Sequence, residues 1–279
     1  MSPLIEVAAI AALPTDNVVI VDARSGPDSY ERYLQGHLPG AVFIDLDKDL
    51  AKLPQDAAYG GRHPLPDIQA FAALLGRLCI GKETHVIVYD DKAAANPAAR
   101  FWWMLHAVGH KNVQVLNGGL QAAIAAGLAL STEAALAKEL EPYPVPEAFT
   151  GTVDLEEAGK AAQDESRVVI DVRETARYLG QTEPIDLIAG HIPGAVNIPF
   201  VNNMGPDNRY LPADELQSAY TAALGAVNPE NVIVHCGSGV TACHTLLALE
   251  HAGIKGAKLY VGSWSEWSRR DLPIATNER

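Results

Sequence analysis

The chain contains the same seven-residue pattern twice. GHLPGAV occupies residues 36–42, and GHIPGAV occupies residues 190–196. A similar order of short apolar runs and helical stretches surrounds both copies. Because internal similarity on this scale indicates a duplicated structural unit, we expect the chain to form two related domains of similar architecture.

The apolar runs around each copy predict a parallel sheet. In chain order they are NVVIVDAR (17–24), HVIVYD (85–90) and VQVLNGG (113–119), then RVVIDVR (167–173), NVIVHC (231–236) and AKLYVGS (257–263). They are short, rich in Val and Ile, and separated by helical stretches, which is the pattern of parallel strands buried on both faces and joined by helical crossovers. The predicted fold class is therefore α/β, with each domain a parallel sheet flanked by helices.

The sequence between the two repeats predicts a linker. KELEPYPVPEAFTG, at residues 138–151, carries three prolines and several acidic residues and has no apolar periodicity, as expected of a semi-extended connection. We assign a first domain to residues 1–137, a linker to 138–155 and a second domain to 156–279.

Composition limits the classes of partner. The formal net charge is −13, which argues against an electrostatic grip on nucleic acid or on an anionic membrane surface. No apolar run is long enough to span a bilayer, and the N-terminus lacks the basic leader of a signal peptide. Three cysteines in a chain of this length do not make a disulfide framework, so we expect a reducing, cytoplasmic setting.

The two halves differ where one strand ends. Aligning HVIVYD with NVIVHC places Asp90 opposite Cys236, and only Cys236 is followed by a glycine-rich loop, GSGVT. Ligands of open α/β sheets bind at the carboxyl ends of the strands. We therefore expect a catalytic second domain and a non-catalytic first domain.

The loop after Cys236 suits a nucleophilic thiolate. A strand, a tight glycine turn and a helix N-terminus bring backbone N–H groups around one point, which binds anions and stabilises a thiolate. The loop amides expected to hold a substrate or a sulfur-borne charge are those of Gly237, Gly239, Val240 and Thr241. Tyrosine-type phosphatases share the His-Cys start, but their arginine is replaced here by Ala242. A small anion such as a persulfide fits this loop better than a phosphate.

With these motifs in place, the chain resembles the tandem-domain rhodanese, or sulfurtransferase, family over nearly its whole length. CGSGVT (236–241) is similar to the loop of the 3-mercaptopyruvate sulfurtransferases, whereas thiosulfate sulfurtransferases favour two basic residues directly after the cysteine. The resemblance implies two tandem rhodanese-like domains. It also implies sulfur transfer from 3-mercaptopyruvate, through a Cys236 persulfide, to thioredoxin, a small thiol or cyanide, without a cofactor.

The resemblance also implies roles for other residues. The family's substrate-binding arginine falls on Arg177, and its Ser-His-Asp relay falls on Ser238, His63 and Asp47. The family's second arginine is missing, because Ile185 and Asp186 stand where it is expected. This departure leaves open a thiosulfate sulfurtransferase and a non-catalytic sulfur carrier as alternatives.

Structural roles compete with several of these assignments. His63 could cap a turn beside Pro64, Asp47 could N-cap a short helix, and Arg62 is a further candidate contact for an anionic substrate. Residues that recur in both halves are expected to support the scaffold, namely His37, His191, Arg24 and Arg173.

The other cysteines invite two further interpretations. Cys79 and Cys243 are expected to be small core side chains. His235, Cys236, Cys243 and His244 form no recognised zinc spacing, so we assign no metal site.

Overall fold

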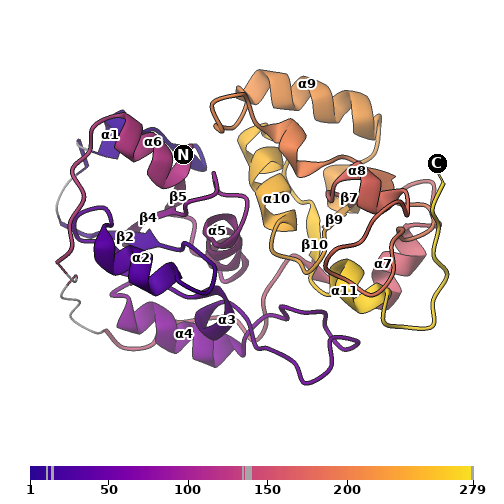
Figure 1. Ribbon diagram of the computed structural model, residues 1–279, viewed down its shortest axis with the longest axis horizontal. Helices are drawn as coiled ribbons and strands as arrows, with labels where there is room; N and C mark the ends of the chain where they lie inside the picture. Colours follow the sequence, from indigo (N-terminus) through magenta and orange to yellow (C-terminus); the bar gives the residue numbers. More distant parts are fainter. Residues whose placement is uncertain (11, 14–15, 134, 136–139, 278–279) are drawn as a thin grey trace. The chain divides into compact units, whose positions relative to one another are not determined.

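The computed structural model describes residues 1–10, 12–13, 16–133, 135 and 140–277 (Figure 1). It divides into two compact units. The first contains residues 1–52, 66–150 and 206–209, and the second contains residues 53–65, 151–205 and 210–279. Among the described residues, no helix has the length and apolarity needed to cross a membrane.

The first unit is built on a five-stranded parallel sheet in the order β1-β5-β4-β2-β3. Its strands are β1 (Leu4–Ile5), β2 (Val18–Asp22), β3 (Val42–Phe43), β4 (His85–Tyr89) and β5 (Val113–Leu116). Its helices are α1 (Val7–Ile10), α2 (Ser29–Gln35), α3 (Leu46–Asp49), α4 (Ile68–Arg77), α5 (Pro97–Ala107) and α6 (Gly119–Ala125).

The second unit repeats this topology in the order β6-β10-β9-β7-β8, again with parallel pairing. Its strands are β6 (Thr152–Val153), β7 (Val168–Asp171), β8 (Val196–Asn197), β9 (Val232–His235) and β10 (Lys258–Tyr260). Its helices are α7 (Leu155–Ala161), α8 (Thr175–Tyr178), α9 (Ala213–Leu224), α10 (Ala242–His251) and α11 (Ser263–Trp267), with 3₁₀ turns η1 (Phe200–Asn203) and η2 (Pro229–Asn231). The predicted α/β class and the duplication are confirmed.

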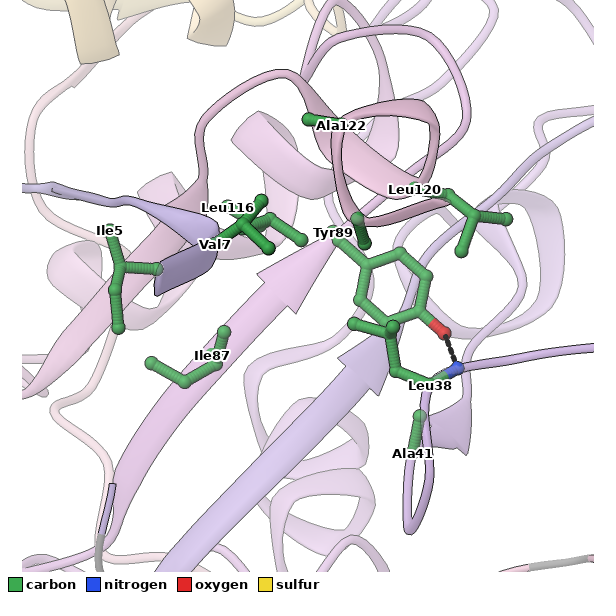
Figure 2. Packing of buried hydrophobic residues seen from close by; sticks show 10 residues of the cluster. Ile5, Val7, Leu38, Ala41, Ile87, Tyr89, Leu116, Leu120 and Ala122 are labelled. Carbon is green, nitrogen blue, oxygen red and sulfur yellow. Dashed lines mark hydrogen bonds between the residues drawn. The ribbon is translucent and has the colours of Figure 1, made fainter. Parts of the chain in front are cut away.

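Each sheet is covered by its own apolar core. Figure 2 shows the first, in which side chains from the strands pack against α6 and the turn at Leu38 and Ala41. Tyr89 is fully buried in this core, where its hydroxyl accepts from the Leu38 N–H and donates to Asp22. A matching cluster around Tyr260 and Trp264 fills the second unit. Each sheet is thus stabilised by buried side chains of its own unit.

The residues that recur in both halves have the expected scaffold contacts. His37 stacks on Tyr33 and His191 stacks on Tyr178, and each imidazole Nδ1 lies 2.7 Å from the carbonyl oxygen of its tyrosine. The other recurring pair, Arg24 and Arg173, forms bidentate ion pairs with the aspartates that end β2 and β7, Asp22 and Asp171. These four side chains hold the turns between strands in both domains.

The segment expected to be a linker contains ordered contacts in its described part. Residues 138 and 139 lie outside the described residues. Further on, Leu140 and Tyr143 donate backbone hydrogen bonds to Gly76 and Ala72 of α4. Strand β6 and the start of α7 also fall inside the range 138–155. This proline-rich segment therefore contains regular secondary structure and hydrogen bonds to α4.

Candidate active site

Cys236 lies at the carboxyl end of β9, the central strand of the second sheet. Cys236 is only 3% exposed to solvent. The chain then turns through Gly237, Ser238 and Gly239 before α10 begins at Ala242. Gly239 has φ +74°, and a Cβ there would lie 2.4 Å from the Val261 carbonyl oxygen. Only glycine fits this position, because other residues would combine a left-handed backbone with a backbone clash.

Helix α11 fixes the direction of the loop's peptide groups. The N–H groups of Trp264 and Ser265 donate to the carbonyl oxygens of Cys236 and Gly237, at 3.0 and 2.8 Å. In a trans peptide the N–H points opposite to the C=O. The N–H groups of Gly237 and Ser238 therefore point away from α11.

Four loop amides lack an acceptor within the described part of the chain. No hydrogen bond of the described residues has the backbone N–H of Gly237, Ser238, Val240 or Thr241 as its donor. Three of these residues are buried. Buried N–H groups are nearly always paired with protein, water or a ligand. Their position at the N-terminus of α10 suits a small anion carried by the neighbouring cysteine.

Ser238 is held by a histidine from a distant part of the chain. Its Oγ lies 2.8 Å from His63 Nδ1. His63 belongs to the segment 53–65, which groups with the second unit although strands of the first unit precede and follow it in sequence. Two members of the expected relay thus meet within one unit, whereas the sequence placed His63 in the first domain.

Asp47, the third expected member of the relay, belongs to the first unit and lies in the first turn of α3. The interpretation that it caps this helix is wrong. Asp45 is the N-cap, and its side chain accepts from the N–H groups of Asp47 and Lys48. The role of Asp47 in a relay remains a prediction.

Arg177 is buried near the loop and pairs with the buried carboxylates of Glu183 and Asp186, and with the exposed carboxylate of Glu174 at 3.6 Å. Its Nε and Nη2 donate to Glu183 at 3.1 and 2.7 Å, and Nη2 lies 3.4 Å from Asp186. Burial disfavours the charged guanidinium, but Glu183 outweighs it and raises the pKa of Arg177. Burial likewise opposes ionisation of Glu183, and the Arg177 guanidinium reverses this and lowers the pKa of Glu183. Arg177 is therefore a fixed cation.

Arg62 and Arg269 reach the same place from other elements. Arg62 Nε and Arg269 Nη1 each donate to Asp186 Oδ1 at 3.0 Å. A Cβ built on Gly237 would lie 3.0 Å from Arg62 Nη2 and 3.6 Å from Arg177 Nη2. Cations therefore border the cysteine loop at Gly237, even though the loop carries no basic side chain of its own.

Sequence reasoning missed Arg269 and two serines. Ser263 Oγ accepts from the Cys236 N–H, and Ser265 Oγ accepts from the Arg62 N–H. Ser263 has φ +53°, an uncommon backbone conformation that often marks functional sites. Both serines lie in the short motif GSWSEW (262–267), which is a sequence signal that could have marked them.

The first unit fills the corresponding loop with its own side chain. Asp90 follows β4 as Cys236 follows β9, and it is buried. Its carboxylate accepts from the backbone N–H groups of Lys92, Ala94 and Ala98. Burial raises the pKa of Asp90 to about 6, against the effect of these three donors. The loop after Asp90 therefore encloses a carboxylate of its own.

We predict that Asp90→Cys creates no second sulfur-carrying site and destabilises the first domain. Three N–H groups would lose their acceptor, and those of Ala94 and Ala98 are buried, at a cost of about 1–3 kcal/mol for each buried unsatisfied group. Thermal unfolding should show a lower midpoint. Mass spectrometry after donor treatment in a Cys236→Ser background should show no added sulfur, and a 32-dalton gain at residue 90 would contradict the prediction.

The other cysteines differ from each other. Cys243 is fully buried on α10, and its Sγ donates to Gly239 O at 3.4 Å, as expected of a core residue. The expectation was wrong for Cys79, which is half-buried with φ +61°. Helix α4 ends just before this residue, and the chain turns there in a left-handed conformation.

The two histidines weighed as metal ligands have other partners. His235 Nδ1 lies 3.2 Å from Cys236 O, and His244 Nδ1 lies 2.7 Å from the Tyr210 hydroxyl. Within the described ranges, no group of three or more His, Cys, Asp or Glu side chains is arranged to hold a metal ion.

Comparison with known proteins agrees with this geometry. The rhodanese-like domain family matches residues 7–126 and 154–270. A Pseudomonas aeruginosa protein named "Probable 3-mercaptopyruvate sulfurtransferase" is 39% identical, over 96% of this chain and 95% of its own length. A Bos taurus protein named "Thiosulfate sulfurtransferase" is 34% identical, over 88% of this chain and 82% of its own length.

A solved structure agrees as well. The 3-mercaptopyruvate sulfurtransferase from Leishmania major superposes with a TM-score of 0.81 at 29% identity, covering 95% of this chain and 74% of that protein. Two matched domains, relatives above 30% identity over most of their length, and a cysteine at the carboxyl end of the central strand lead to one assignment. The chain belongs to the rhodanese family of sulfurtransferases and carries two rhodanese-like domains in tandem.

Proposed function

We propose that this protein transfers the sulfur of 3-mercaptopyruvate to a thiol or to cyanide, with Cys236 as the carrier. The observation that supports this most is a set of four loop amides beside a buried cysteine, for which the described residues provide no acceptor. They supply the hydrogen bonds that a persulfide anion needs. The names of the relatives support the same reaction class.

In the first half-reaction, the Cys236 thiolate attacks the sulfur of 3-mercaptopyruvate. A sulfur–sulfur bond forms, and the bond between that sulfur and C3 breaks. The electron pair of the broken bond passes to C3 and gives the enolate of pyruvate. The proton of the substrate thiol ends on C3, so a Cys236 persulfide anion and pyruvate are formed. Since the cysteine itself carries the sulfur, the step requires no metal or organic cofactor.

Ser238 and His63 are the proposed proton carriers for this step. Their 2.8 Å contact is within the reach required of an acid–base pair. Ser238 lies two residues from Cys236, so its hydroxyl can receive the substrate proton or orient the keto group. Asp47 is the proposed third member of the relay.

Arg177 is proposed to bind the substrate's carboxylate and keto oxygen, with Gly237, Gly239, Val240 and Thr241 providing loop amides. A guanidinium presents several donors in one plane, which suits a carboxylate. Arg62 is proposed as a second cation for this carboxylate, in place of the arginine that the sequence lacks.

In the second half-reaction, an acceptor removes the outer sulfur. A thiol, such as thioredoxin or a small thiol, becomes a persulfide, or cyanide becomes thiocyanate, and the Cys236 thiolate is restored. The three cysteines fit a reducing cytoplasm. The net charge of −13 argues against nucleic-acid or membrane partners for this reaction.

A donor panel with cyanide as acceptor tests the proposal. We expect kcat/KM for 3-mercaptopyruvate to exceed that for thiosulfate by about tenfold or more, because a neutral Gly237–Ser238 pair offers no counter-charge to a dianion. Thiocyanate formation and pyruvate release would be measured together. A preference for thiosulfate would identify a thiosulfate sulfurtransferase instead. A persulfide that forms but never turns over would identify a non-catalytic sulfur carrier.

A further inference from the structure

Asp186 lies among the three arginines that border the candidate site. Its side chain is fully buried. It accepts from Arg62 Nε and Arg269 Nη1 at 3.0 Å, and Arg177 Nη2 lies 3.4 Å from its other oxygen. The three arginines come from separate parts of the second unit, so this one carboxylate joins them.

The buried charges around Asp186 nearly cancel. Three guanidiniums, those of Arg62, Arg177 and Arg269, face two buried carboxylates, those of Asp186 and Glu183. Glu183 also accepts from the N–H groups of Ile185 and Asp186 and so fixes the turn that carries Asp186. Arg173 also contacts Glu183, but its charge is matched by Asp171. Glu174 lies 3.6 Å from Arg177 Nη1, but its side chain is 59% exposed, so solvent screens its charge. Among the buried carboxylates, the three guanidiniums are therefore one charge in excess.

The position of Gly237 ties this group to the reacting sulfur. A Cβ at residue 237 would lie 3.0 Å from Arg62 Nη2 and 3.6 Å from Asp186 Oδ2. Arg62 thus occupies the space into which a side chain at residue 237 would project. A donor bound at the Cys236 loop meets the guanidiniums there, and its electrostatic energy depends on their net charge.

We propose that Asp186 determines donor specificity by neutralising part of this arginine cluster, so that the site favours a monoanionic 2-oxo acid over a dianionic donor. This inference rests on the proposed function. One uncompensated charge matches a single carboxylate, whereas a dianion would need a second cation that Asp186 already binds. The same carboxylate positions Arg62 beside Gly237.

The test compares donor preference in Asp186→Asn and the unsubstituted protein. Asparagine keeps the shape of the side chain and removes its charge, leaving two uncompensated cations. The ratio of kcat/KM for thiosulfate to that for 3-mercaptopyruvate should rise about tenfold or more. It should also become more sensitive to ionic strength. A purely structural defect would lower kcat/KM for both donors by the same factor. The ratio would then stay unchanged, and this result would overturn the inference.

Two further variants complete the design. Glu156→Gln makes the same change in net charge on an exposed helix face, 2.7 Å from Lys160, and should leave the ratio within about twofold because exposed charges are screened. An equal shift in that variant would mean a bulk charge effect and would contradict the role of Asp186. Arg62→Gln removes a cation from the cluster and should move the ratio the opposite way, which tests the inference even if Asp186→Asn fails to fold.

Failure of the proposed function is distinguishable from failure of this inference. If the unsubstituted protein does not release pyruvate from 3-mercaptopyruvate, the proposed function is wrong. If it does, and the ratio stays unchanged in soluble, folded Asp186→Asn and in Arg62→Gln, only the specificity role is wrong.

Discussion

Cys236→Ser should abolish sulfur transfer from every donor while leaving the protein folded. A hydroxyl is almost entirely protonated at neutral pH, and it cannot form the bond to sulfur on which the carrier mechanism depends. We expect turnover to fall by at least about four orders of magnitude, as when other covalent nucleophiles are removed. Thiocyanate formation measures turnover, and intact mass after donor treatment should show no added sulfur.

Cys79→Ser is the matched control for this variant. Cys79 lies in the first unit, half-buried and outside the proposed site. Its replacement should leave turnover and the mass gain unchanged. Retention of more than about one per cent of the activity in Cys236→Ser would contradict the assignment of the nucleophile, as would a loss of the mass gain in Cys79→Ser.

The fold was predictable because its signals are local. Short Val- and Ile-rich runs alternate with helical stretches, and both sets of strands form parallel sheets in the same order. The Cys236 loop also lies where its glycines placed it, at the end of β9 and before α10. Strand ends and glycine turns are set by neighbouring residues, so a single sequence carries enough information to locate them.

The cationic side of the site was only partly predictable because its contacts are remote in sequence. Arg62 and Arg269 meet Asp186 across 124 and 83 residues, and no spacing rule connects them. The sequence marked Asp186 only as a departure from a family pattern. Arg62 reaches Asp186 because the segment 53–65 groups with the second unit. Folding, not local propensity, brings these residues together.

Arg177→Lys should raise KM for 3-mercaptopyruvate by about 10- to 100-fold and change that for thiosulfate less. Lysine keeps the positive charge but replaces the planar fork with one ammonium group. In the structure, the Nε–Nη2 edge of Arg177 already binds Glu183, so the substrate can use only its remaining donors. A single ammonium cannot serve Glu183 and a substrate carboxylate with the same geometry.

Comparison with a remote site separates this loss from a general effect of the substitution. Arg167→Lys makes the same chemical change at Arg167, whose Nη2 lies 2.7 Å from Glu157, and should leave both KM values unchanged. Steady-state kinetics with both donors would be measured at constant ionic strength. Because lysine preserves the charge of the site, a difference between the donors reports on the geometry of the donor groups. If Arg177→Lys raises KM equally for the two donors, Arg177 acts as a point charge. The loop amides together with Arg62 must then orient the carboxylate. If only 3-mercaptopyruvate is affected, the planar donor set of Arg177 recognises the 2-oxo acid, and specificity follows from geometry at Arg177 as well as from charge at Asp186.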